Sequence, residues 1–183
     1  MLLRLSDERY EEIKEEVVEL YKELHITKFP VNAKDVCNQL KIVLKSYNQF
    51  TEQALAAVIR TSEDGIVAKI DNHYEIFYNS SKDTARIRST IFHEIGHIRL
   101  HHLIHDEENE AEANFFACYF LAPPPLIHHF NFEYLHEVMD KFWVTVSLAE
   151  NAFSRYQKWL RFSGSCYTQY ERELLELAKE GEN

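Results

Sequence analysis

Apolar residues recur with helical spacing at both ends of the chain and with strand-like spacing in its middle. Residues 7–24 place apolar side chains on one face and glutamates on the other, which predicts an amphipathic helix capped by Ser6. A short helix is predicted from Asn32 to about Leu40. Later helices are predicted over residues 107–122, 132–141, 146–160 and 168–179.

The middle of the chain changes to short β-rich segments separated by polar links. Strands are expected over residues 42–44, 55–61, 66–70 and 74–79. Glu63-Asp64-Gly65 is predicted to be a hairpin turn, because such turns favour an Asp-Gly pair. The chain therefore predicts an α+β fold, in which a small, largely antiparallel sheet packs on the following helix and on further helices, with a helical C-terminal portion.

The helix after the sheet carries the motif His93-Glu94-Ile95-Gly96-His97, which reads H-E-x-x-H. Its apolar residues have helical spacing, and Ser80 or Ser81 is expected to cap its start. Residues four apart share one helix face, so both imidazoles can reach a single ion. Glu94 then lies beside that ion, where a general base belongs. A glycine inside a helix also suggests close packing at Gly96.

The motif alone is short enough to occur by chance, and histidines recur at positions 93, 97, 101 and 105. Only the first pair has a glutamate directly after its first histidine, so His93 and His97 are the predicted ligands. We interpret His101, His102 and His105 as a solvent-facing continuation or a weak adventitious metal patch.

Zinc in a hydrolase usually takes three protein ligands and leaves the fourth position to water. Leu100 and Leu103 occupy the positions at which the metzincin pattern requires glycine and histidine, which excludes that class. The third ligand is therefore expected among the acids that begin the helix over residues 107–122.

Glu110 and Asn114 share one face of that helix, whereas Glu112 points about 200° away from Glu110. We favour Glu110 as the ligand over Glu112. Asn114 is expected to hydrogen-bond a ligating histidine and so to orient its ring. The other acids, Glu107, Glu108 and Glu112, are interpreted as ordinary residues of a solvated helix start.

HEIGH and the downstream run EAEANFFACYFLAPP resemble the ImmA/IrrE family of metallopeptidases, whose pattern is H-E-x-G-H followed by E-x-E-A-N/D-x-F-A-x-x-x-L-x-P. The resemblance implies zinc held by His93, His97 and Glu110, with Glu94 as the catalytic base. It also implies that the substrate is a helix-turn-helix transcriptional repressor, often encoded beside the peptidase on a phage or other mobile element. Cleavage would relieve repression under stress. The chain departs from many members at Ala122-Pro123, where they have Leu-Met-Pro or similar.

Composition limits the partners of the protein. With 20 basic and 30 acidic residues its formal charge is −10, which argues against direct binding to nucleic acid. The three cysteines form no C-x-x-C pair, and Met1-Leu2-Leu3-Arg4 is not typical of a signal peptide, so a cytoplasmic location is expected. No apolar run approaches the roughly 18–20 residues of a membrane span.

Residues 1–125 are predicted to form a zincin-like metallopeptidase domain, and residues 126–183 a helical portion packed on it. Two helices in that portion, 132–141 and 146–160, resemble a helix-turn-helix. The pair could contact DNA or a protein, or it could be a packed αα-hairpin. The acidic charge favours the packed hairpin, with a core of Phe142, Trp143, Phe153 and Trp159.

The predicted function is that of a zinc-dependent endopeptidase. Tyr74, Ile76 and Tyr78 lie on a predicted strand that could be a sheet edge holding an extended peptide, although an ordinary packed strand is equally compatible with them. The alternative function is a non-proteolytic regulator that binds a repressor or DNA through the same metal-stabilised fold.

Overall fold

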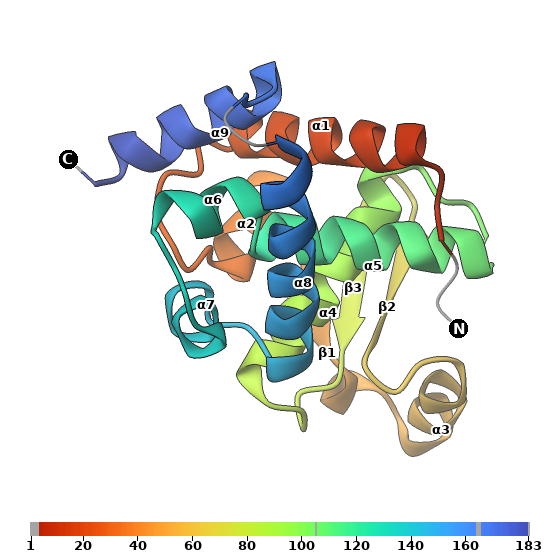
Figure 1. The fold of residues 1–183 in the computed structure, drawn as a ribbon. Helices are drawn as coiled ribbons and strands as arrows, with labels where there is room; N and C mark the ends of the chain where they lie inside the picture. The colour runs from red at the N-terminus through yellow and green to blue at the C-terminus, as the bar shows by residue number, and fades with distance from the viewer. Residues whose placement is uncertain (1–3, 105, 164–165, 183) are drawn as a thin grey trace.

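The computed structural model describes residues 4–104, 106–163 and 166–182 (Figure 1). Its elements, in chain order, are α1 (Asp7–Glu23), α2 (Ala33–Gln39), β1 (Val43–Ser46), η1 (Tyr47–Gln49), α3 (Glu52–Thr61), β2 (Gly65–Ile70), β3 (His73–Tyr78), α4 (Thr84–Arg99), α5 (Glu107–Leu121), α6 (Pro124–His129), α7 (Leu135–Phe142), α8 (Val146–Ser163) and α9 (Gln169–Glu180). The α+β class predicted from the sequence is confirmed.

The sheet has the strand order β1-β3-β2, so β3 is its central strand. β3 pairs antiparallel with β2 and parallel with β1, and Ile76 lies opposite Val67 on one side and Leu44 on the other. The prediction that Tyr74, Ile76 and Tyr78 form a substrate-binding edge is wrong, because neighbouring strands occupy both edges of β3. Residue alternation within one strand carries no information about which strands pair beside it.

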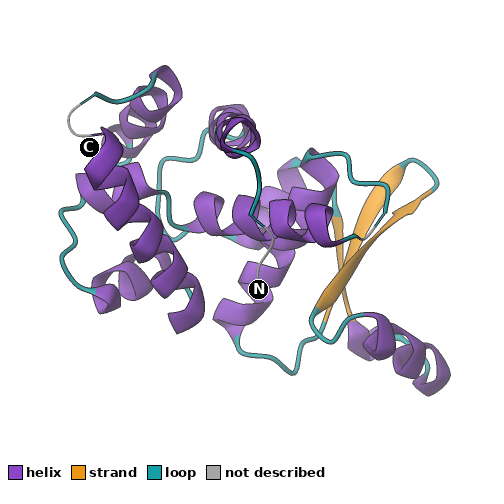
Figure 2. Cartoon of the chain, turned by 45° about the vertical axis from the view of Figure 1, so that its right-hand side comes forward, coloured by secondary structure: helices purple, strands orange, loops and turns teal. Residues whose placement is uncertain are grey.

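Two local predictions in this region are also wrong. Residues 55–61 lie in α3, where the Thr51 hydroxyl accepts a hydrogen bond from the Ala54 N–H at 3.4 Å and caps the helix start. A short apolar run is ambiguous between helix and strand, and here the cap and the alanines favour the helix. Figure 2 shows α3 beside one end of the sheet, apart from the other helices.

The hairpin turn between β2 and β3 consists of Asp71 and Asn72, and Asp71 has a φ of 51°. Asp64 instead directly precedes β2, which begins at Gly65, and both residues lie against α4. A Cβ on Gly65 would lie 2.5 Å from Thr90 Cγ2, and the Asp64 carboxylate accepts two hydrogen bonds from Arg86, at 2.8 and 2.9 Å. The Asp-Gly pair therefore makes a close contact between β2 and α4 and does not form a hairpin turn. The preference of Asp-Gly for turns is local and does not reveal such a contact.

α4 lies between the sheet and α5, and α5 is covered in turn by α1 and α8 (Figures 1 and 2). One hydrophobic core contains residues of α1, α2, β3 and each of the helices from α4 to α9. At its centre the rings of Phe92 and Phe120 stack at 4.5 Å, and the Tyr21 hydroxyl donates to the Phe120 carbonyl at 2.6 Å. The motif helix is thus held in place from both sides.

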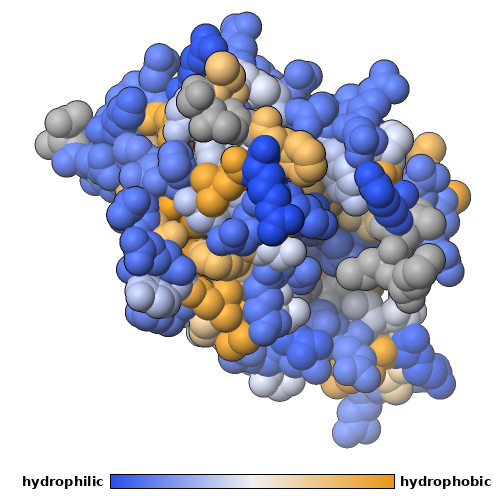
Figure 3. All heavy atoms as spheres, in the orientation of Figure 1, coloured by the Kyte–Doolittle hydropathy of each residue, from blue (hydrophilic) through white to orange (hydrophobic). Residues whose placement is uncertain are grey.

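Polar residues cover most of the face seen in Figure 1, with a hydrophobic strip down its middle (Figure 3). Among the described residues, no helix combines the length and the apolar character needed to cross a membrane.

Arg88 connects the motif helix to the turn between α7 and α8. Its guanidinium donates to the carbonyl oxygens of Val31 at 2.9 Å and Phe142 at 2.7 Å, and also to the carbonyl of Trp143. Burial lowers the pKa of Arg88 to about 10. Trp143 lies at this turn with a φ of 48° and is 50% exposed, so its predicted place in a hairpin core is wrong, whereas Phe142 is fully buried.

Arg88→Ala is expected to lower the free energy of unfolding by about 2–3 kcal/mol, because three carbonyl oxygens lose a charged donor. Urea denaturation measures this change. Arg86→Ala removes a more exposed arginine from the same helix and serves as the control, with an expected loss below about 1 kcal/mol. Equal losses in the two variants would contradict the role assigned to Arg88.

Candidate metal centre

α4 presents the two motif histidines on one face. Its N-cap is Asp83, whose carboxylate accepts the Arg86 N–H at 2.9 Å, and not Ser80 or Ser81 as predicted. The helix then continues without interruption to Arg99. Across one turn, the Nε2 atoms of His93 and His97 lie 3.0 Å apart.

α5 brings a carboxylate to the same point. Glu110 Oε2 lies 3.3 Å from His93 Nε2, and Glu110 Oε1 lies 3.4 Å from His97 Nε2. Potential ligand atoms of the three residues all lie within 4.8 Å of one another. The structure thus brings together His93, His97 and Glu110.

This donor set fits a zinc ion. With Zn–N distances of about 2.0–2.1 Å, two ligand atoms of a tetrahedral site lie about 3.3–3.4 Å apart. The observed separations of 3.0, 3.3 and 3.4 Å are close to that spacing. Two imidazoles and one carboxylate would leave the fourth position for water.

Close packing at Gly96 explains how α5 reaches the histidines. A Cβ at this position would lie 3.2 Å from Phe116 Cβ and 3.3 Å from Ala113 Cα. Because both atoms belong to or adjoin the α5 backbone, a larger residue would push the whole helix away. The glycine therefore lets α5 approach closely and present Glu110, one turn before Ala113 and Asn114.

Glu94 is 4% exposed and lies in the wall of a cleft of about 870 Å³ that also contains His93, Glu110 and Asn114. The start of α8 lines the same cleft, through Val146 among others. A carboxylate next to the ligands, in a cleft large enough for a peptide segment, is suited to transfer a proton during hydrolysis.

Asn114 lines the cleft together with His93, and its side chain contributes to the pKa of His93. Burial by itself lowers the pKa of His93. Hydrogen bonds to Glu110 and Asn114, together with the charges of Glu94 and Glu110, outweigh burial and raise this pKa above its ordinary value.

Glu112 and His102, which were predicted to face solvent, have side chains that are buried close to the predicted ligands. Glu112 is buried instead of solvated, and its carboxylate lies 2.9 Å from His102 Nε2 and accepts two hydrogen bonds from Arg9. His102, predicted to face solvent, has its Nδ1 2.9 Å from His97 Nδ1. His101 is exposed as predicted, and His105 lies outside the described residues.

A sequence signal for Glu112 did exist. Residues 112, 115, 116 and 119 have helical spacing and all are buried, so Glu112 belongs to the apolar face of α5. By contrast, Glu107 and Glu108 are exposed, as predicted. An acid on an apolar face needs a buried partner, and the sequence did not indicate that Arg9 would supply it.

Comparison with known proteins finds one family whose sequence model matches this chain. The sequence model of peptidase family M78, described as the IrrE N-terminal-like domain, matches residues 40–154. This segment contains the sheet, α4, α5 and every residue of the candidate metal centre. No curated protein and no solved structure matches the chain significantly. Because the match covers more than half of its residues, the chain belongs to the M78, IrrE N-terminal-like family of peptidases.

Proposed function

We propose that the protein is a zinc-dependent endopeptidase that cleaves a helix-turn-helix transcriptional repressor. The observation that carries the enzymatic part is the convergence of His93, His97 and Glu110, two of which line one cleft together with the buried Glu94. All four residues lie in the segment that matches the peptidase family.

His93, His97 and Glu110 would hold the zinc, and the bound ion would supply Lewis acidity for a carbonyl oxygen and for water. Glu94 takes the proton of the attacking water and passes it to the leaving amine. The position of Glu94 between the two histidines on α4 keeps its carboxylate near the ligands without adding it to the donor cluster. Asn114 orients the His93 ring through its hydrogen bond.

β2 replaces β3 as the candidate strand for substrate binding. Among the described strands β2 pairs only with β3, so its other edge has no strand partner, and its first residue, Gly65, lines the cleft. An extended peptide beside this edge would make main-chain hydrogen bonds that do not depend on its sequence. Such binding favours an unfolded or extended polypeptide segment as the substrate.

Two arguments favour a repressor as the substrate. The resemblance of the HEIGH and EAEAN segments to the ImmA/IrrE family implies it. In addition, a DNA-binding repressor has a basic surface for phosphate, and a protein with a charge of −10 attracts such a surface.

A non-proteolytic regulator is the second candidate, because α7 and α8 are joined by only the three residues 143–145, as in a helix-turn-helix. However, the first turn of α8 lines the cleft through Val146, Ser147 and Leu148. This placement favours contact with a substrate in the cleft over insertion into a DNA groove.

The test is to incubate the zinc-loaded protein with a candidate helix-turn-helix repressor and to measure fragment masses. We expect cleavage at a defined peptide bond, its loss on chelation and its recovery when zinc is restored. A repressor that stays intact under all conditions, while its DNA binding still changes on addition of the protein, would favour the non-proteolytic regulator.

A further inference from the structure

A chain of hydrogen-bonded side chains runs from the predicted ligand His97 to the N-terminal helix. His97 Nδ1 lies 2.9 Å from His102 Nδ1, and His102 Nε2 lies 2.9 Å from Glu112 Oε2. Arg9 of α1 then donates to both oxygens of Glu112, from Nε at 2.7 Å and from Nη2 at 2.5 Å. Residues 103 positions apart in the sequence thus meet behind the metal centre.

This series of hydrogen-bonded side chains is shielded from water except at Arg9. The side chains of His97, His102 and Glu112 are 3%, 5% and 7% exposed, whereas that of Arg9 is 32% exposed. Hydrogen bonds in such surroundings are strong, and an unpaired polar atom there is costly. Arg9 donates to both oxygens of Glu112, so the two side chains form a bidentate pair in which the carboxylate only accepts.

The direction of these hydrogen bonds determines which nitrogens carry protons. The Glu112 carboxylate only accepts hydrogen bonds, so His102 Nε2 must donate to it. With neutral imidazoles, His102 Nδ1 then has a lone pair and accepts from His97 Nδ1–H. His97 Nε2 is thereby left unprotonated and faces His93 and Glu110, as a metal ligand requires.

We propose that Arg9, Glu112 and His102 are positioning residues that hold His97 in the tautomer and ring orientation needed for zinc binding. The inference rests on the proposed zinc site. It makes α1 part of the metal centre, although Arg9 lies outside residues 40–154, which match the peptidase family. Arg9 orients Glu112, Glu112 orients His102, and His102 orients the ligand.

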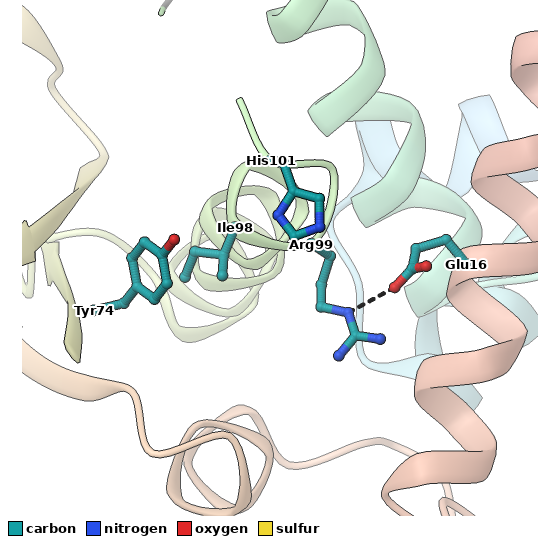
Figure 4. A pocket seen from close by; sticks show the side chains of 5 residues that line it. All are labelled: Glu16, Tyr74, Ile98, Arg99 and His101. Atoms are coloured by element: carbon teal, nitrogen blue, oxygen red, sulfur yellow. Dashed lines mark hydrogen bonds and ion pairs between the residues drawn. The ribbon is translucent and has the colours of Figure 1, made fainter. Parts of the chain in front are cut away.

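The protein offers a matched control, a second arginine that contacts α1 from the core. Arg99 of α4 also ties α1 to the core, because it donates to Glu16 at 2.7 Å and to Glu23 at 2.7 Å. Its side chain is 22% exposed, and Figure 4 shows it directed at Glu16 in a separate pocket with Tyr74 and His101. No ligand histidine is among its partners, so loss of Arg99 tests anchoring of α1 alone.

The experiment measures zinc affinity by competition with a chromophoric chelator for the wild type, Arg9→Gln, His102→Leu and Arg99→Gln. Arg9→Gln and His102→Leu are expected to bind zinc about 10–100-fold more weakly, and Arg99→Gln to bind it like the wild type. Urea unfolding of the zinc-free proteins compares how strongly each arginine anchors α1. NMR of the imidazole nitrogens in the zinc form should show the His97 Nδ1 proton in the wild type and its faster exchange in His102→Leu.

Results that contradict the positioning role can be distinguished from results that contradict the zinc site. Wild-type affinity in Arg9→Gln, or equal weakening in Arg99→Gln, would overturn the positioning role while leaving the proposed peptidase intact. Absence of zinc binding by the wild-type protein would instead refute the proposed zinc site, and the inference with it. Should His102→Leu fail to fold, the two arginine variants still decide the question, because both side chains are partly exposed.

Discussion

Replacing Glu94 with glutamine is expected to abolish cleavage of the proposed repressor substrate while zinc remains bound. The amide has the size and shape of the carboxylate but cannot accept the proton of the attacking water. General-base catalysis typically contributes about 10²–10⁴-fold to a rate, so the loss should be at least of that order. Cleavage rates from timed fragment analysis, with zinc per chain measured on the same samples, test both parts of the prediction.

Glu75→Gln is the matched control for this variant. Glu75 is also a buried carboxylate, but it lies on β3, where it pairs with Lys45 at 2.6 Å. This variant should retain the cleavage rate of the wild type. If Glu94→Gln still cut the repressor at a comparable rate, or if it had lost its zinc, the assignment of Glu94 as the base would be wrong.

Replacing Glu110 with alanine is expected to remove zinc from the protein. Among the residues that the structure describes, the cluster of potential ligands consists of Glu110 and two histidines, so without Glu110 two imidazoles would remain. The loss of affinity should exceed the roughly 10–100-fold expected for a residue that acts through a ligand. Zinc per chain after dialysis against a weak chelator measures the effect, and cleavage should disappear with the metal.

Two further variants of α5 make this prediction specific. Glu107→Ala removes an exposed acid from the first turn of the same helix and should leave the zinc content unchanged. Glu112→Ala should weaken binding to an intermediate extent, because Glu112 reaches the site only through His102. Loss of zinc in the Glu112 variant alone would mean that Glu110 is not the third ligand.

Local chemistry in the sequence predicted much of what surrounds the candidate site. The spacing of His93 and His97 on a helix, and of Glu110 and Asn114 on the next, depends only on the geometry of 3.6 residues per turn. The cap at Ser6 also acts within a few residues. These features are short-range, so a single sequence was sufficient to infer them.

Strand order is different, because it depends on pairing between segments far apart in the sequence. The sequence indicated most of the strand residues but not that β1 pairs parallel with β3, which makes β3 central. α3 shows a related limit. Its apolar run fitted both helix and strand periods, and the wrong choice suggested a further strand where the chain forms a peripheral helix.

By itself, the sequence determined the α+β class, the H-E-x-x-H motif on its helix and the helix face on which Glu110 lies. Only the tertiary structure decided that β3 is the central strand and β2 an edge strand of the described sheet, and that Gly65 and the start of α8 line the cleft. It also placed Arg9 against Glu112, and His102 between Glu112 and His97. The physical reason is that helix faces and caps follow from local backbone geometry, whereas strand order and buried ion pairs depend on long-range packing of the whole core.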